Sequence, residues 1–204
     1  MPRWTALSGA AFTLLFALAA ILYGSGAGSD ASQILVYYSR PAARRHQELG
    51  FAVLLVACLL LLHFVAVLRV RVARTSPASA VLLLSGGATV VLLMIANGLW
   101  AATAFTVEIQ GGAVVVSPSA HLLLEDASFV LVVTAAAAAI PMVIVTCNEV
   151  LRRGGLPRWY AWLGWLAVAG LASAYAYFPL SAFLIWIAAG SLLLSTQADV
   201  PTGR

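Results

Sequence analysis

Six runs of mostly apolar residues, separated by short polar segments, dominate the chain. A helix needs about 20 such residues to cross the hydrocarbon core of a bilayer. Each run therefore predicts one spanning helix, and together they predict an all-α bundle of six transmembrane helices in a single domain, residues 1–204. The predicted spans are roughly residues 5–23, 49–69, 78–105, 124–148, 158–177 and 179–196.

The first run allows a second interpretation. Arg3 precedes its apolar core and small residues follow it, as in a secretory signal peptide. No clear Ala-x-Ala cleavage pattern lies between Gly24 and Ala31. An uncleaved first helix is therefore the preferred interpretation.

Composition points to lipid as the solvent of most of the surface. The 204 residues are 63% hydrophobic and 9% charged, with a mean hydropathy of +1.00, whereas soluble domains carry about 25% charged residues. The formal net charge of +4 is divided among short loops, and nucleic-acid-binding proteins present a continuous basic face. The expected partners are membrane lipids, with a protein partner or further copies of the chain in the membrane as the alternative. No nucleic acid is expected.

The distribution of arginine predicts an orientation, because basic residues gather on the cytoplasmic side of membrane proteins. If the N-terminus is cytoplasmic, eight arginines fall in inner segments and three in outer segments. We therefore expect a multi-pass plasma-membrane protein with both termini in the cytoplasm. The inner residues are Arg3, Arg69, Arg71, Arg74, Arg152, Arg153, Arg158 and Arg204, and the outer ones are Arg40, Arg44 and Arg45.

Two outer segments have a strand-like pattern. In residues 106–117, TVEIQGGAVVVS, β-branched residues flank a Gly-Gly pair, which is a two-residue hairpin signal. Residues 33–39, QILVYYS, form a second run of this kind. One prediction is a small extracytoplasmic β-hairpin cap with a third strand from residues 33–39. The alternative is an irregular loop.

Charged and imidazole side chains gather at the outer ends of the second and fourth predicted helices. Two of them, His121 and Glu125, are four residues apart and share a helix face. One hypothesis is a polar cluster that binds a ligand head group, a proton or a metal. The alternative is an interfacial network of salt bridges, with acids in a first turn stabilised by the helix dipole. The candidate residues are Arg44, Arg45, His46, Glu48, His121, Glu125 and Asp126.

The adjacent acids Glu125 and Asp126 must point about 100° apart on a helix. We expect Asp126 to turn into the bundle and pair with Arg44 or Arg45, because it lies one residue deeper and continues into apolar neighbours. Glu125 is then expected to face water or to cap the helix start.

Asn97 lies deep in the third run, within MIANGLW. An amide in hydrocarbon needs a hydrogen-bond partner, so Asn97 is predicted to face protein. It is a candidate ligand contact, and an interhelical hydrogen bond is the alternative.

Familiar cofactor and catalytic patterns are lacking in the sequence. His46, His63 and His121 share no mid-membrane depth, as a bis-histidine haem requires. Cys58 and Cys147 differ in depth by roughly 20 Å at the helical rise, too far for a disulfide. No metal-binding pattern, phosphate loop or catalytic triad is visible. We therefore expect no cofactor and no metal, and favour a protein that is not an enzyme.

The segment GGLPRWYAWLGWLAVAG, residues 154–170, resembles an element of uncharacterised bacterial six-helix membrane proteins. In that family a Leu-Pro-Arg-Trp loop precedes a helix with Leu-Gly-Trp, and an acid such as Asp126 opens the preceding helix. The likeness covers about residues 45–195. It implies a six-helix integral membrane protein in a bacterial plasma membrane and brings no substrate or catalytic residue. The matching residues are Leu156, Pro157, Arg158, Trp159, Leu163, Gly164 and Trp165.

Two functional classes remain. The first is binding or transport-like handling of a small amphipathic molecule or lipid from the outer face. The second is a non-catalytic accessory subunit of a membrane complex. A pocket lined by Asn97 and opening toward Glu125 favours the first, whereas a solid core with a flat apolar outer patch favours the second.

Overall fold

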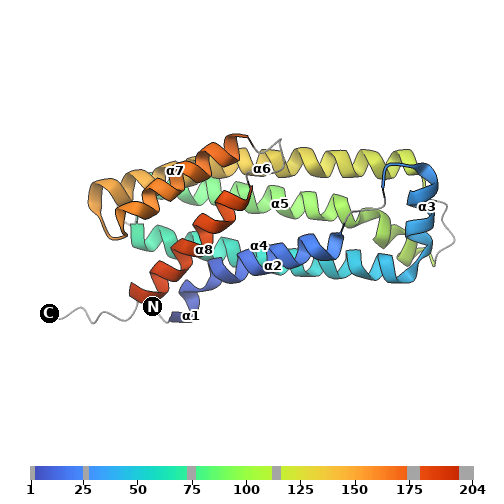
Figure 1. The fold of residues 1–204 in the computed structure, drawn as a ribbon, viewed down its shortest axis with the longest axis horizontal. Helices are drawn as coiled ribbons and strands as arrows, with labels where there is room; N and C mark the ends of the chain where they lie inside the picture. Colours follow the sequence, from blue (N-terminus) through green and yellow to red (C-terminus); the bar gives the residue numbers. More distant parts are fainter. Residues whose placement is uncertain (1–2, 25–27, 73–76, 112–115, 174–179, 198–204) are drawn as a thin grey trace.

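The structure, a computed structural model, describes residues 3–24, 28–72, 77–111, 116–173 and 180–197, and every regular element in these ranges is an α-helix (Figure 1). The elements are α1 (Arg3–Ala6), α2 (Ser8–Tyr23), α3 (Ala31–Ser39), α4 (Pro41–Val72), α5 (Ala78–Ile109), α6 (Pro118–Arg153), α7 (Arg158–Ala172) and α8 (Leu180–Gln197).

Three of these helices, α4, α5 and α6, are long and apolar enough to cross a membrane, which indicates a membrane protein. They coincide with the second, third and fourth predicted spans. The helices on the first, fifth and sixth apolar runs are shorter, with 16 residues in α2, 15 in α7 and 18 in α8. The last part of the predicted fifth span, residues 174–177, lies outside the described residues.

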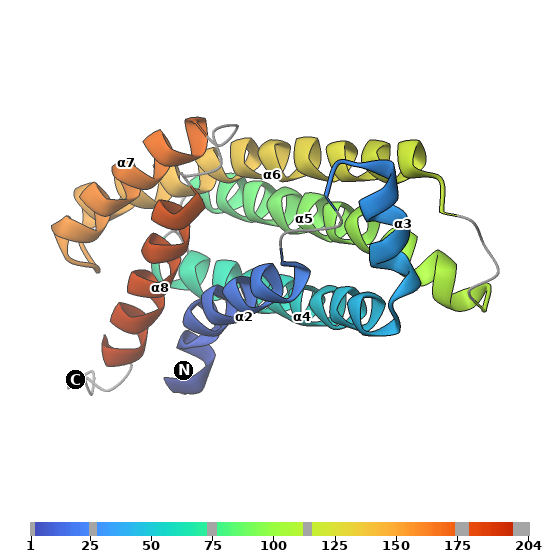
Figure 2. The same ribbon diagram turned by 45° about the vertical axis from the view of Figure 1, so that its right-hand side comes forward.

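The long helices lie side by side, and the shorter ones pack around one half of their length (Figures 1 and 2). Helix α2 packs against α4 and α8, while α7 packs against α6 and α8. Helix α1 and the carboxyl end of α8 lie at the end of the molecule opposite α3 (Figure 1). We call the two ends the α1 end and the α3 end.

The contact between α5 and α6 is built around a proline. Pro141 lies inside α6, and a proline in a helix disturbs the backbone hydrogen bonds of the preceding turn. The Ser85 hydroxyl of α5 donates to Ala138 O and accepts from Met142 N at 3.0 Å. Ser85 thus stands between a carbonyl and an amide that would bond each other in a regular α-helix.

Small residues allow α6, α7 and α8 to approach closely. A Cβ atom added at Gly164 of α7 would lie 2.3 Å from Cys147 Sγ and 2.9 Å from Trp186 Nε1. Nearby, the rings of Tyr160 and Trp186 stack with centroids 5.3 Å apart. Glycine at position 164 therefore fits a gap that alanine would overfill. Cys58 and Cys147 are both free and buried, as expected.

The long helices exceed the thickness of a bilayer. At 1.5 Å per residue, the 32 residues of α4 and of α5 extend roughly 48 Å, against a hydrocarbon core of about 30 Å. The long helices continue past the level of Tyr23 toward α3, and their ends on that side form a smaller bundle, which we call the α3-end extension. It consists of residues 41–49 of α4, 98–109 of α5 and 118–127 of α6, with α3 packed against α4 and α6.

The predicted β-cap is wrong in the described residues, because helices occupy both strand-like segments. Residues 33–39 lie in α3, where Ile34 and Tyr38, four residues apart, are buried on one face against Ala104. The strand-like run from Thr106 to Ile109 continues α5. A small core at the α3 end, separate from the main one, thus outweighs the β propensity of these residues.

Gly111, the first glycine of the predicted hairpin turn, ends a helix instead. Gly111 has a φ of +65° and its amide donates to Glu108 O at 3.1 Å. A left-handed glycine just after the last helical residues is a common way to end an α-helix. Residues 112–115, where the rest of the hairpin was predicted, lie outside the described residues.

Candidate functional site

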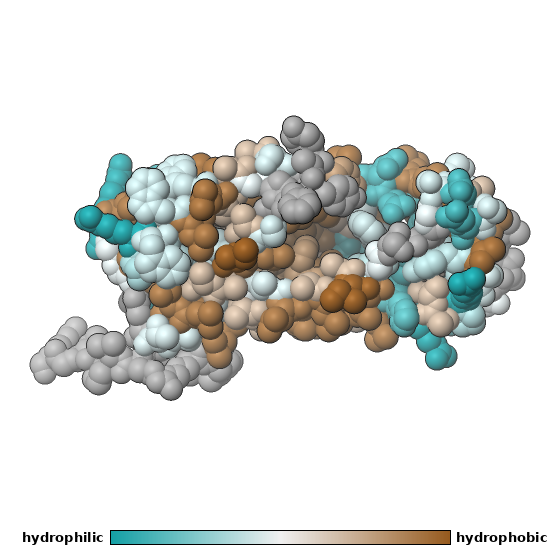
Figure 3. Space-filling view, in the orientation of Figure 1, coloured by the Kyte–Doolittle hydropathy of each residue, from teal (hydrophilic) through white to brown (hydrophobic). Residues whose placement is uncertain are grey.

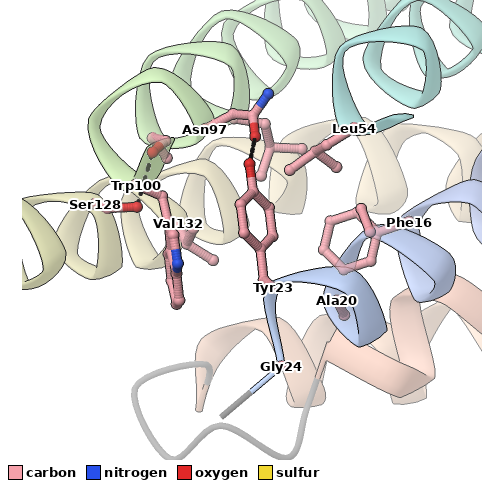
Figure 4. A pocket seen from close by; sticks show the side chains of 12 residues that line it. Phe16, Ala20, Tyr23, Gly24, Leu54, Asn97, Trp100, Ser128 and Val132 are labelled. Carbon is pink, nitrogen blue, oxygen red and sulfur yellow. Dashed lines mark hydrogen bonds between the residues drawn. The ribbon is translucent and has the colours of Figure 1, made fainter. Parts of the chain in front are cut away.

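A cavity of about 260 Å³ lies between α2, α4, α5 and α6, near the end of α2 that faces α3 (Figure 4). Ala20 and Gly24 of its rim are exposed. Among the described residues that line it, none carries a charge. Most of the wall is apolar, with Phe16, Leu54, Leu93, Ala96, Trp100 and Val132 as its principal contributors.

A buried amide and phenol form the polar part of the cavity wall. The Tyr23 hydroxyl of α2 donates to Asn97 Oδ1 of α5, and Asn97 Nδ2 donates to Phe51 O of α4 at 3.0 Å (Figure 4). Asn97 is 2% exposed. The prediction that Asn97 faces protein is therefore confirmed, and its amide connects three helices.

Two further residues complete the α3 side of the cavity. The Ser128 hydroxyl of α6 donates to Ala96 O at 2.8 Å, which fixes α6 beside α5 at this level. The Trp100 ring lies 5.6 Å from the Tyr23 ring between centroids. An aromatic ring with a polar edge suits a membrane boundary, so this level is consistent with the edge of the hydrocarbon core.

A second, smaller cavity of about 20 Å³ adjoins the first. Phe16, Leu93 and Val132 line both. The smaller cavity lies further toward the α1 end, between Phe12 of α2 and Phe183 of α8. We call the two together the α2–α6 groove, and Figure 3 shows apolar side chains around a hollow on this face between α6 and α2.

A separate polar cluster lies in the α3-end extension, around His121. His121 Nδ1 is 3.2 Å from Thr103 Oγ1 and 3.4 Å from Tyr38 Oη, and Tyr38 Oη donates to Gln47 Oε1 at 3.2 Å. On the other side of the ring, Nε2 is 3.8 Å from Glu125 Oε2. The predicted shared face of His121 and Glu125 is thus confirmed.

The environment of His121 favours its neutral form. The side chain is 6% exposed, and burial lowers its pKa below the ordinary value of 6.5, while Glu125 partly opposes this shift. Burial also raises the pKa of Tyr38. With Thr103 donating to Nδ1, the remaining proton of the imidazole would lie on Nε2, toward Glu125. A cavity of about 240 Å³ adjoins the ring, between the ends of α5 and α6.

The expected pairing of Asp126 with an arginine is wrong. Asp126 is exposed, and Glu125 is the acid that turns toward the protein. Arg44 instead pairs with Glu108 of α5, Nε to Oε2, at 3.0 Å, and donates through Nη1 to Tyr38 O at 2.8 Å. The helix rotation that puts Ser128 against α5 carries Asp126, two residues earlier, to the outside.

The other residues predicted for the polar cluster, Arg45, His46 and Glu48, form no hydrogen bond or ion pair with His121 in the described part of the chain. Arg45 and His46 are exposed, and Glu48 is half-buried. The structure therefore brings His121, Glu125 and Arg44 to one end of the molecule and places Asn97 in the cavity. Glu125 is absent from the cavity wall, so of the feature that favours ligand binding, the pocket lined by Asn97 is present and its opening toward Glu125 is not.

Sequence reasoning missed the partners of Asn97 and the wall opposite it. In the sequence, Tyr23 stands at the end of an apolar run and Ser128 follows Glu125 by three residues. Both have a sequence signal, because a hydroxyl beside a long apolar run needs a partner inside the bundle. In the part of the chain that the structure describes, no three His, Cys, Asp or Glu side chains are grouped as metal ligands would be.

No protein-family model, curated protein or solved structure matches the chain. The resemblance to bacterial six-helix membrane proteins therefore stays a prediction.

Proposed function

We propose that the protein binds a small amphipathic molecule or lipid in the cavity beside Asn97. The observation that carries this proposal is the cavity itself, with about 260 Å³ lined by apolar side chains and a few polar groups. Ligand pockets for small molecules range upward from about 300 Å³ and have this kind of lining. The volume of the cavity thus lies just below the lower end of that range.

The polar groups of the wall support an amphipathic ligand rather than a hydrocarbon. Tyr23 Oη and Asn97 Oδ1 each keep an acceptor lone pair beyond the bond that joins them. Both lie on the side of the cavity nearest α3, while Phe16, Leu93 and Val132 lie toward the smaller cavity. A molecule with a polar head and an apolar tail matches this order.

The proposed membrane arrangement has six spans, with both termini in the cytoplasm of a bacterial cell. Arginines support it, because Arg69 and Arg71 end α4, Arg152 and Arg153 end α6, and Arg158 begins α7, all at the α1 end. The α3 end then faces outward. Reporter fusions after Thr75 and after Gly155 are expected to be cytoplasmic, and an external signal at either position contradicts the orientation.

The alternative function, an accessory subunit, receives less support from the structure. Apolar side chains cover the outer faces of the long helices, but lipid covers such faces in any membrane protein. A solid core would favour an accessory subunit, and the cavity between the helices departs from that. The cavity is therefore the reason for preferring ligand binding to the accessory-subunit function.

Gentle purification followed by mass spectrometry of retained small molecules tests the proposal. Val132 lines the cavity and is half-buried, whereas Val130 of the same helix is 61% exposed. Val132→Trp should expel a bound molecule that the wild type and the matched variant Val130→Trp retain. Equal retention by all three proteins, or no retained molecule in any of them, contradicts binding in this cavity.

A further inference from the structure

We infer that the α2–α6 groove receives one acyl chain of a lipid from the leaflet on the α3 side, entering sideways between α2 and α6. This inference rests on the proposed binding function and names the class of ligand. The head group would lie near Tyr23 and Trp100, and the chain would run toward Phe12 and Phe183.

The length of the groove agrees with the thickness of one leaflet. Trp100 lines its wide part and Thr89 its narrow part. These residues are eleven positions apart on α5, which is roughly 16 Å at the helical rise. One leaflet contributes about half of a 30 Å hydrocarbon core, or about 15 Å. The groove thus runs from the boundary level of Trp100 to about the middle of the membrane.

The volume of the groove fits one chain and not two. A dry cavity of about 150 Å³ holds benzene. On that scale, about 260 Å³ holds roughly ten carbon atoms. The narrow part adds only about 20 Å³, so the groove tapers toward the α1 end. On the same scale the narrow part holds about one carbon atom, which places the terminal methyl of a single chain between Phe12 and Phe183.

The arrangement of the helices gives a lateral entrance. Helix α2 packs against α4 and α8, whereas α6 packs against α5 and α7. The two walls of the groove therefore have no extensive contact with each other, and α5 lies between them as the floor. The exposed rim residues Ala20 and Gly24 lie on the α2 side, and the hollow between α2 and α6 is visible from outside (Figure 3).

The wall also restricts the head group. Recognition of a phosphate or carboxylate uses Arg, Lys or convergent N–H donors, and among the described residues the groove offers no cation. The acidic residues Asp126 and Glu125 precede Ser128 of the groove wall by two and three positions, and Glu125 shares its helix face. The groove is therefore suited to a neutral or zwitterionic head group.

Photo-cross-linking with two forms of lysophosphatidylcholine tests the inference. Both probes have one chain, with a diazirine either at the chain end or next to the head group. The full-length protein in phosphatidylcholine nanodiscs is irradiated, and labelled residues are mapped by mass spectrometry. The chain-end probe should label Phe12, Phe183 or Leu184, and the head-proximal probe should label Tyr23, Trp100 or Ser128.

Variants separate this inference from the broader proposal. Val132→Trp should reduce groove labelling at least fivefold, while Val130→Trp leaves it unchanged. If both probes label only Tyr23, Trp100 or Ser128, and Val132→Trp still reduces labelling, the cavity binds an amphiphile but no chain lies along the groove. Labelling only of lipid-facing residues such as Leu14 and Val130, equal in all variants, overturns the inference and the proposed function together.

Discussion

The Tyr23 hydroxyl at the end of α2 donates a hydrogen bond to Asn97 Oδ1 in α5, across the wall of the cavity (Figure 4). These residues are 74 positions apart in the sequence. Asn97 Nδ2 also donates to Phe51 O of α4, so one buried amide joins three helices.

Removing this amide should weaken the bundle. Hydrogen bonds between membrane helices contribute about 0.6–2 kcal/mol, and Asn97→Leu should lower the free energy of unfolding in mixed micelles by about this amount. Tyr23→Phe should cost less, because Asn97 keeps its bond to Phe51 O. In the double variant the loss in free energy of unfolding should be smaller than the sum of the losses in the two single variants. Full additivity would mean that the two side chains do not interact.

The Ser85 hydroxyl should contribute most to stability when Pro141 is present. Ser85→Ala leaves Met142 N and Ala138 O without the group that stands between them, at an expected cost of about 1–3 kcal/mol. In a Pro141→Ala background the cost should fall, because these two backbone groups can approach each other as in a regular helix. Thr134→Ala is the matched control, since the exposed Thr134 hydroxyl bonds only Val130 O of its own helix. An equal cost of Ser85→Ala in both backgrounds contradicts this account.

Two glycine-to-alanine substitutions should have very different effects on the stability of the protein. Gly164→Ala would overpack the contact with Cys147 and Trp186, at a cost of about 1–3 kcal/mol. Gly87→Ala has open space around its new methyl group and should be neutral or stabilising. Thermal unfolding of the purified variants measures both effects. If Cys147→Ala does not reduce the cost of Gly164→Ala, the close contact with the sulfur is not its cause.

The α3-end extension should become less stable in mild acid. His121 has a folded-state pKa below 6.5, so the unfolded extension binds the proton more readily. Its stability is therefore complete above pH 6.5 and falls as the pH drops below that value. Between pH 7.5 and 5.5 the protection factors of α3 amides, which are corrected for the slowing of intrinsic exchange in acid, should fall. The same measurement on His121→Gln should show no such fall, and an equal fall would contradict the assignment to His121.

The two adjacent acids should affect His121 differently. Glu125 raises the pKa of His121 against the effect of burial, so Glu125→Gln should lower that pKa further in an NMR titration. Asp126 is exposed on another face, and Asp126→Asn should leave the titration unchanged. The reverse result would restore the inward role that the sequence suggested for Asp126.

The helical membrane character and the inward position of Asn97 could be predicted from physical requirements. In lipid a long apolar run forms a helix, and a buried amide needs a hydrogen-bond partner in the protein. The rotation of α6 could not be predicted, and Asp126 therefore exchanged roles with Glu125. Their positions differ by one residue, and the contact between Ser128 and Ala96 O, far away in sequence, decides which acid turns inward. Helix α3 was predicted as a strand for a related reason. Ile34 and Tyr38 read equally well as alternate strand residues or as a helix face, and only burial against Ala104 selects the helix.

The position of a heavy atom on a bound lipid tests the central claim most directly. The protein is crystallised with a lysophosphatidylcholine brominated at the end of its chain, and the bromine is located by anomalous scattering. We expect a bromine between Phe12, Phe183 and Leu184 in the wild type and in Val130→Trp, and none there in Val132→Trp. Bromine found only on the outer, lipid-facing surface of the helices would contradict a ligand groove between α2 and α6.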